Sequence, residues 1–250
     1  MKVRAVKTRK FLPPKDDLFS LIKESFKKKD IKERSIIVVT SKIVSIWQGR
    51  CVEKSDKINK INKDKLIEKE ADFYLDKKKV AQPWVRLTIK DGILIPTAGI
   101  DESNANGYYV LWPRDPFSAA KKLHNFIKKE YNLKDFGVII SDSHTAPLRN
   151  GITGIGMAYY GFYPLRDYRG LKDIFGRVLK MTQTNIIDSL VTAAVFEMGE
   201  GNEQKPFAVI EDLGNIKFGN FGQKDLLIMD KDKDIYAPLI KSVKWEKSRK

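Results

Sequence analysis

Blocks of consecutive β-branched residues alternate along the chain with stretches in which apolar residues recur at helical spacing. Ile36–Val39 and Val138–Ile140 are continuous apolar runs, as is typical of strands buried on both faces. Apolar residues recur every three or four positions in Pro116–Tyr131 and Thr182–Met198, and Gly199 follows as the expected C-terminal cap. This pattern predicts an α+β fold in which helices flank mixed or antiparallel sheets.

Shorter signals complete the predicted order of elements. Val3–Val6 is typical of a strand, and Asp16-Asp17 favours the start of a helix because acidic side chains stabilise helix N-termini. Asp91-Gly92 lies between two apolar runs and predicts a tight hairpin turn. The lysine-rich stretch 53–79 predicts a surface helix after a loop. We expect polar loops at Thr40-Ser41-Lys42 and at Ser141-Asp142-Ser143, directly after the two buried strands.

Length and composition predict one folded unit. The chain has 250 residues, of which 42% are hydrophobic and 10% aromatic, and these are values of globular proteins. We found neither an internal repeat nor a long linker, so residues 1–250 are expected to form a single domain of one or two intertwined subdomains. Residues 239–250 form a basic C-terminal tail.

The formal net charge of +15 raises the possibility of a nucleic-acid-binding protein, because basic surfaces attract polyanions. Lysine far outnumbers arginine, however, and arginine is the residue that recognises phosphates and guanine edges with two parallel hydrogen bonds. The composition therefore argues against nucleic acid as the main partner. A basic surface that attracts anionic nucleotides and substrates fits it better.

Cys51 is the single cysteine, which excludes a disulfide framework and suits a reducing compartment, so we expect a cytoplasmic protein. No apolar run is long enough to span a bilayer, and no membrane partner is expected. A P-loop motif is absent, and the sequence around Gly154-Ile155-Gly156 lacks the rest of a dinucleotide fingerprint. His124 and His144 are too few for a histidine-rich zinc site.

Hard oxygen ligands stand at three predicted structural boundaries. Asp101 lies in a loop after the hairpin, Asp142 and Ser143 follow a buried strand, and Glu200 lies between two glycines. Such oxygens suit Mg²⁺ or Mn²⁺, which are held by few carboxylates together with water and phosphate oxygens. Each residue taken alone is better explained by an ordinary turn or a solvated loop. The residues by themselves therefore indicate only a candidate site for a hard cation.

The same segments resemble the coenzyme F420:L-glutamate ligase family, in order and across residues 36 to 210. The matching motifs are Thr40–Ser45 with Gly49-Arg50, Ala98–Asn104, Asp115-Pro116, Gly137–Ser143, Asp167–Gly170, Asp173–Arg177 and Met198–Gly201.

This resemblance implies a fold, a ligand set and an assembly. Two divalent ions would hold GTP, with Asp101, Asp142, Ser143 and Glu200 as metal ligands. The positions that match nucleotide contacts are Ser41, Lys42, Asn104, Met198, Gly199 and Gly201. The family fold has two α+β parts, and its members form a tightly interlocked homodimer.

The resemblance also implies a reaction. GTP would phosphorylate the acceptor carboxylate, and the amino group of glutamate would attack the resulting acyl phosphate. Asp142 would be essential to this chemistry as a metal ligand, and Arg149 is a hypothetical anion clamp.

Two departures from the family pattern bear on the substrates. Thr145-Ala146 replaces an expected Gly-Arg pair after Asp142-Ser143, and His144 is a possible substitute donor. Ile46 stands where relatives often carry a lysine, so a preference for GTP over ATP is open. The leading acceptor is a deazaflavin precursor of coenzyme F420. Folate or another pterin is the second hypothesis, and a non-catalytic protein that binds nucleotides or polyanions is the third.

Overall fold

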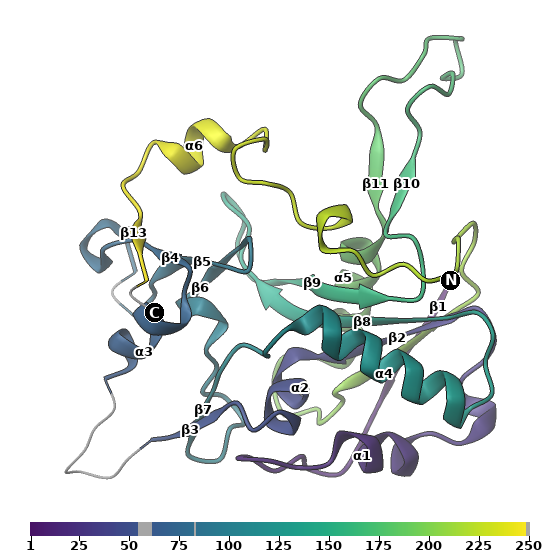
Figure 1. Ribbon diagram of the computed structural model, residues 1–250, viewed down its shortest axis with the longest axis horizontal. Coiled ribbons are helices and arrows are strands. Elements are labelled where there is room, and N and C mark those ends of the chain that lie inside the picture. The colour runs from purple at the N-terminus through teal and green to yellow at the C-terminus, as the bar shows by residue number, and fades with distance from the viewer. Residues whose placement is uncertain (55–61, 83, 249–250) are drawn as a thin grey trace.

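The computed structural model describes residues 1–54, 62–82 and 84–248, and its centre is a five-stranded sheet with helices on both faces (Figure 1). The strand order is β1-β12-β2-β8-β9, and β2 and β8 run parallel while the other neighbours are antiparallel. The five strands are β1 (Lys2–Val6), β2 (Ser35–Thr40), β8 (Phe136–His144), β9 (Thr153–Tyr160) and β12 (Phe207–Glu211). The sheet is mixed, which confirms the predicted α+β class.

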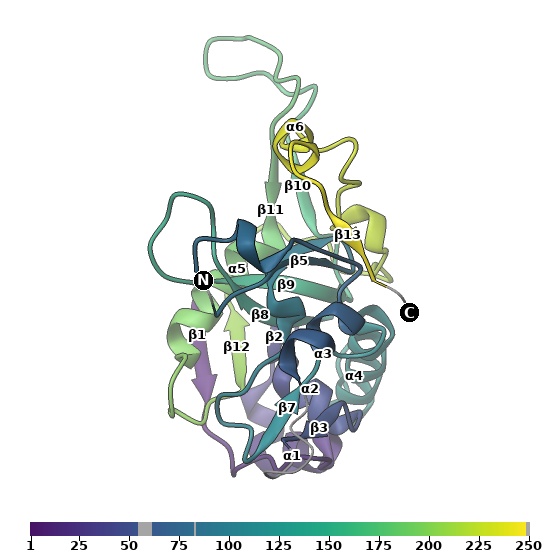
Figure 2. The same ribbon diagram turned by 90° about the vertical axis from the view of Figure 1, so that its left-hand side faces the viewer.

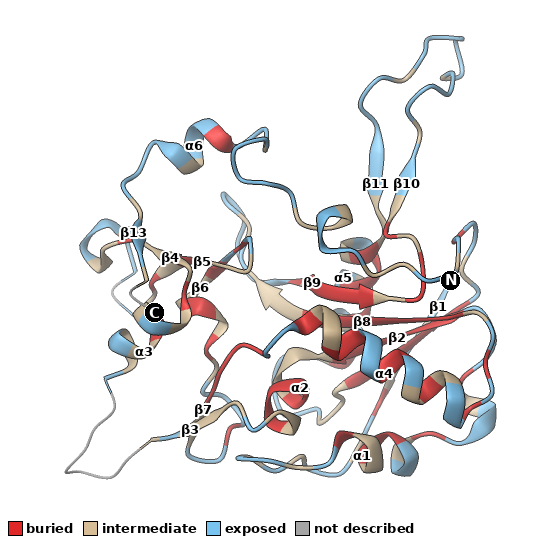
Figure 3. Ribbon diagram, in the orientation of Figure 1, coloured by how far each residue is buried: buried red, intermediate tan, exposed pale blue. Residues whose placement is uncertain are grey.

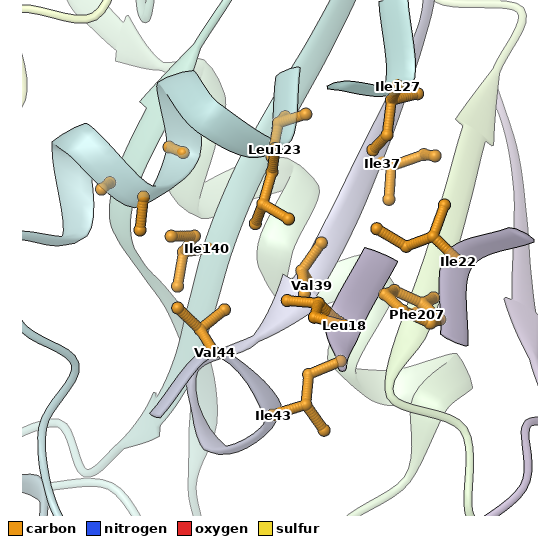
Figure 4. Close-up of a cluster of buried hydrophobic side chains, with 14 of the residues drawn as sticks. Leu18, Ile22, Ile37, Val39, Ile43, Val44, Leu123, Ile127, Ile140 and Phe207 are labelled. Atoms are coloured by element: carbon orange, nitrogen blue, oxygen red, sulfur yellow. The ribbon is translucent and has the colours of Figure 1, made fainter. Parts of the chain in front are cut away.

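Alternating residues of the central strands face two separate hydrophobic layers. Ile37 and Val39 of β2 pack in one cluster, whereas Ile36 and Val38 pack in another. The first cluster includes residues of α1, α2 and α4, and Figure 4 shows its side chains converging on the sheet. The second includes Ile187 and other residues of α5. Because both faces are covered, these strands are continuous apolar runs, and Figure 3 shows them buried.

The helices are α1 (Leu18–Ser25), α2 (Ser41–Trp47), α3 (Lys63–Glu70), α4 (Pro116–Glu130), α5 (Ile186–Met198) and α6 (Ala237–Lys241), with short 3-10 turns η1 (Lys28–Asp30), η2 (Lys77–Lys79), η3 (Thr97–Gly99) and η4 (Lys224–Leu226). The sequence predicted the start of α1, both ends of α4 and the end of α5, whereas α2 and α6 were not predicted. Asp17 caps α1 by accepting the amide of Phe19, as its acidic position predicted. Within the predicted helix 53–79, α3 is the α-helical part, and residues 55–61 lie outside the described ones.

Three predicted boundaries were wrong. Ser41 begins α2 immediately after β2, so the expected polar loop is absent at this point of the described chain. β8 continues through Ser141, Asp142 and Ser143 to His144, because these residues pair with β9. The helix expected from Thr182 begins at Ile186, since β11 (Gln183–Asn185) pairs with β10 (Leu165–Asp167).

Three smaller pairings surround the central sheet. A four-stranded sheet in the order β13-β4-β5-β6 contains the predicted hairpin at Asp91-Gly92, and both turn residues have positive φ. The remaining strands are β3 (Cys51–Glu53), β4 (Phe73–Tyr74), β5 (Leu87–Lys90), β6 (Ile93–Pro96), β7 (Tyr108–Val110) and β13 (Glu246–Lys247). The predicted basic tail 239–250 contains the end of α6 and also β13, which pairs with β4, while residues 249–250 lie outside the described ones.

The hairpin of β10 and β11 projects away from the body as a long arm, which Figure 2 shows in side view. We call residues 165–185 the arm. Its tip carries apolar side chains in water: Ile174 is 91% exposed and Phe175 is 89% exposed. Across the part of the chain that the structure describes, no helix combines the length and apolarity needed to cross a membrane.

Candidate functional site

Two parallel strands deliver the first site residues to the same edge of the central sheet. Thr40 of β2 pairs in register with Ser141 of β8, so Ser41 and Asp142 follow side by side. The carboxyl ends of parallel strands are the usual place for ligands in such sheets. The sheet therefore brings together two segments that sequence analysis had selected separately.

Asp101 reaches this edge on a loop that pairs with β7 of the two-stranded β3–β7 sheet. The Asp101 amide and carbonyl exchange hydrogen bonds of 2.9 Å with Val110. Just before it, Gly99 has φ +66, and a Cβ at this glycine would lie 2.3 Å from the Trp112 ring. Trp112 in turn donates a hydrogen bond of 2.8 Å to Asp91 in the hairpin turn. Glycine at position 99 thus permits the close packing that fixes the loop.

Lys42 is the cation that faces Asp101. Its Nζ lies 2.6 Å from Asp101 Oδ2 and donates to the Ser103 carbonyl and hydroxyl at 3.0 and 3.2 Å. Ser103 also donates to Asp101 Oδ1 through its amide and its hydroxyl, both at 2.8 Å. Burial opposes the charged carboxylate, but Lys42 and Ser103 outweigh it and lower the pKa of Asp101. Asp101 is therefore an ionised carboxylate with several donors around it.

Asp142 has the opposite electrostatic environment. Burial raises the pKa of Asp142 to about 7, although the Ser143 amide donates to its Oδ1 at 2.8 Å. The negative charge of Asp101 raises this pKa further, while the Ser41 hydroxyl and Lys42 lower it. A bound cation would stabilise the charged form of Asp142, because it would offset both the burial of that carboxylate and its repulsion by Asp101.

Ser143, near the end of β8, contacts Glu200, which follows α5. The Ser143 hydroxyl donates to Glu200 Oε1 at 2.6 Å. Glu200 follows α5, which ends at Met198 and is capped by Gly199 at φ 79. The position of α5 across the sheet thus determines where Glu200 lies relative to β8.

The loop after α5 also contacts the loop of Asp101. Asn104 Nδ2 donates to the Gly201 carbonyl at 2.7 Å, and Gly201 donates its amide to Glu203 Oε2 at 2.8 Å. Glu203 was not predicted as a site residue, although its contact with the Gly201 amide spans only two residues. The role of Ser103 was not predicted either, and its signal was its place two residues after an aspartate.

Two predicted residues lie differently from the others. Met198 is the last residue of α5 and is buried in the hydrophobic cluster of that helix, so its side chain serves packing. Arg149 lies on the exposed connection between β8 and β9, and its side chain has no ion pair or hydrogen bond among the described residues. The structure therefore does not bring Arg149 into the cluster.

The oxygen donors fit a hard divalent cation. Among the residues with described positions, no three His, Cys, Asp or Glu side chains lie close enough to hold a metal ion by themselves. Asp101 with Asp142, and Ser143 with Glu200, offer carboxylate and hydroxyl oxygens in pairs. A positive ion would remove the repulsion that Asp101 exerts on Asp142. Mg²⁺ commonly uses one or two carboxylates and completes its shell with water and phosphate.

Comparison with known proteins gives a consistent result. A model of the family F420-0:Gamma-glutamyl ligase matches residues 7–212. A protein of Methanocaldococcus jannaschii named coenzyme F420:L-glutamate ligase is 34% identical over 217 residues, covering 82% of this chain and 86% of its own. One of the same name from Haloarcula marismortui is 30% identical over 94% of this chain and 95% of its own.

Proposed function

Since the chain belongs to the F420-0:Gamma-glutamyl ligase family, we propose that it joins L-glutamate to the terminal carboxylate of a coenzyme F420 precursor, with GTP as the phosphoryl donor. The observation that carries the proposal is the pairing of Asp101 with Asp142 through charge and of Ser143 with Glu200 through a hydrogen bond, with Asp142 and Ser143 adjacent near the carboxyl end of β8. The names of the relatives favour the F420 precursor over folate as the acceptor.

The proposed reaction has two steps. An oxygen of the acceptor carboxylate forms a bond to the γ-phosphorus while the bridging bond to the β-phosphate breaks, which releases GDP. The glutamate nitrogen then attacks the acyl carbon, loses a proton, and the bond between that carbon and the phosphate oxygen breaks, which releases inorganic phosphate. The product is an amide.

Mg²⁺ or Mn²⁺, in two sites held by Asp101, Asp142, Ser143 and Glu200, would neutralise charge on the transferring phosphoryl group. Ser41, Lys42, Asn104 and the backbone of residues 198–201 would position the nucleotide. Lys42 contributes a positive charge beside Asp101, and the bond from Asn104 to Gly201 keeps the two nucleotide loops at a fixed separation. Arg149 would act as an anion clamp only if its exposed loop closes over the substrates.

We also propose that the protein forms a homodimer. The arm supports it, because a hairpin that holds Ile174 and Phe175 in water loses favourable apolar burial unless another surface covers it. A second copy of the chain is the occupant that the resemblance implies.

A mass-spectrometric assay tests the function directly. Purified protein is incubated with glutamate, Mg²⁺ and Mn²⁺, GTP or ATP, and both the F420 precursor and a folate. We expect a mass gain of one or more glutamate residues on the F420 precursor with GTP. A gain on the folate alone would reassign the acceptor, and a gain with ATP alone would reassign the donor. Metal-dependent nucleotide binding without a gain on either acceptor would contradict the proposed reaction.

Metal dependence separates the ligase from a simple polyanion binder. Nucleotide binding that requires Mg²⁺ or Mn²⁺ is expected of the enzyme. Binding to any polyanion without metal, with strong weakening by salt, would instead be explained by the net charge of +15.

A further inference from the structure

A cavity of about 270 Å³ lies beside the cluster of acids, where three parts of the fold meet: the central sheet, the β5–β6 turn and the segment 227–234. Its walls come from the end of β8, from β9, from the β5–β6 turn and from the segment 227–234, which passes over the sheet towards α6 (Figure 1). Ile155 and Gly156 in its wall are the register partners of Asp142 and Ser141. The cavity and the proposed metal site therefore share one pair of strands.

The three parts are packed firmly against one another around this cavity. A Cβ at Gly92 in the β5–β6 turn would lie 2.5 Å from Ile228 Cγ2, so the turn and the C-terminal segment are in contact. Asp188 of α5 accepts the Gly156 amide at 2.8 Å and the Asn185 side chain at 2.6 Å. The cavity is thus a feature of the folded body rather than a gap between loose loops.

Polar groups with spare hydrogen-bonding capacity line the cavity. Neither ring nitrogen of His144 has a hydrogen-bond partner among the described residues. Asp234 accepts the Tyr236 amide at Oδ1, and within the described chain its Oδ2 has no partner. These groups can recognise the N–H and C=O edge of a ring.

The charge of the lining contrasts with that of the protein. Asp188 and Asp234 line the cavity, and no lysine or arginine is among its described lining residues, although the chain carries 47 of these basic residues. Most of the remaining wall is apolar, including Ile93, Ile155 and Ile228. A phosphate or carboxylate would be repelled here, whereas an uncharged flat group with N–H donors would be stabilised.

We propose that this cavity holds the uncharged, nitrogen-containing aromatic ring system of the acceptor, with its ring N–H directed to Asp234 and a ring carbonyl accepting from the N–H of His144. The inference rests on the proposed function in one respect, that the acceptor carboxylate reaches the Asp142 cluster. Thr145 and Ala146, which stand in place of an expected Gly-Arg pair, line the same cavity. The departure from the family pattern thereby removes a cation from the ring site.

The test uses a neutral deazaflavin that carries an uncharged ribityl chain and lacks phosphate and carboxylate groups. Its binding is followed by fluorescence anisotropy with the wild-type protein, with a matched pair of tryptophan variants and with one further variant at Asp234. Ala146→Trp fills the cavity, and Ala81→Trp adds the same ring at an exposed bend. Asp234→Asn removes one acceptor charge without changing size. GTP binding in the presence of Mn²⁺ reports whether each variant is folded.

We expect the probe to bind wild-type protein and Ala81→Trp equally. Ala146→Trp should bind it at least about tenfold more weakly, and Asp234→Asn several-fold more weakly, while both keep GTP binding. Glutarate and inorganic phosphate should not compete. Equal binding by the two Trp variants, competition by glutarate, or no binding by wild-type protein would overturn the assignment.

The same variants separate this inference from the proposed function. If wild-type protein ligates glutamate to an acceptor and Ala146→Trp keeps the wild-type KM for it, the ring site is wrong and the function stands. If no acceptor is ligated but probe binding is lost in Ala146→Trp alone, the proposed reaction fails and the ring site stands.

Discussion

Lys42 Nζ and Asp101 Oδ2 lie 2.6 Å apart, so the cation that follows β2 is paired with the acid that follows the β5–β6 hairpin. The pair gives Asp101 a compensating charge before any ligand arrives. A divalent cation that binds Asp101 must therefore compete with Lys42 or share the carboxylate with it. Under the proposed function, a cation bound to Asp101 would free the Lys42 ammonium for a nucleotide phosphate.

Replacing Lys42 tests this competition. Lys42→Met removes the positive charge while keeping a long side chain, so the affinity of the protein for Mn²⁺ alone should rise several-fold. Affinity for GTP in the presence of Mn²⁺ should fall, because the phosphate loses a cation. Isothermal titration of both ligands measures the two effects, and Lys42→Arg is the matched control that keeps the charge. Weaker Mn²⁺ binding in Lys42→Met would contradict the competition.

Asp142→Asn should abolish ligation and preserve the fold. The neutral amide keeps the shape of the carboxylate but loses the charge that a hard cation needs, so we expect the rate to fall by at least about 100-fold. The melting temperature should stay level or rise, since burial disfavours the charged carboxylate that is removed. Mass-spectrometric turnover and thermal unfolding are the measurements. Retained turnover in the folded variant would refute the role of Asp142.

Glu203 should affect nucleotide affinity through the loop that it holds. Glu203→Ala removes the acceptor of the Gly201 amide, so the loop contacted by Asn104 should become less ordered and GTP should bind several-fold more weakly. Glu203→Gln keeps an oxygen acceptor and should retain most of the affinity. Asn202→Ala is the neighbouring control. Identical affinities for the Ala and Gln variants would show that the hydrogen bond is unimportant.

His124 should make the protein less stable in mild acid. Burial lowers the pKa of His124, with a further contribution from Lys128, even though its ring faces Asn125 and the Phe136 carbonyl. As pH falls below the ordinary histidine value of about 6.5, the unfolded chain binds a proton first and the folded state loses stability until the lowered pKa is reached.

Denaturant unfolding at pH 7.5 and 5.5 measures this loss. We expect wild-type protein to lose up to about 1.4 kcal/mol more than His124→Gln for each pH unit by which the pKa is lowered. The comparison cancels the other groups that titrate in this range. An equal pH dependence of the two proteins would contradict the prediction.

The arm provides a test of the homodimer. Ile174→Glu combined with Phe175→Glu places two charges at the exposed tip, and we expect the mass measured by light scattering to fall from dimer to monomer. Lys180→Glu introduces a negative charge at another exposed position of the arm and should leave the dimer intact. A dimer that survives the double variant would place the interface elsewhere.

Local patterns predicted the elements whose neighbours are close in sequence. The α4 helix, the Asp91-Gly92 turn and the Gly199 cap follow from residue spacing and backbone preference alone. The end of β8 does not, because Asp142 and Ser143 are polar residues that usually favour a loop. They remain in a strand because β9 returns alongside and supplies hydrogen-bond partners. That information lies in tertiary structure.

In the candidate site, too, the sequence predicted the residue types but not the contacts that the fold creates. The residue types of Asp101, Asp142 and Glu200 were visible as hard oxygen ligands, and the order of motifs identified the family. The pairing of Lys42 with Asp101 and Ser103 was not visible, because it joins segments that are distant in sequence. The contacts of Ser103 with Asp101 and of Glu203 with the Gly201 amide each span only two residues, and they were missed although they are local. The exposed position of Arg149 was not visible either, since its loop follows β8 but makes no return contact with the cluster among the described residues.

The hydrogen bonds that assemble the site join residues far apart along the chain, with separations of 57 residues for Ser143 and Glu200, 61 for Lys42 and Ser103, and 97 for Asn104 and Gly201. Each contact closes a large loop, and such contacts carry an entropic cost that local helices do not. The site can therefore form only when nearly the whole polypeptide has reached its native topology. During refolding, metal-dependent nucleotide binding should be among the last properties to return, well after the recovery of helical circular dichroism.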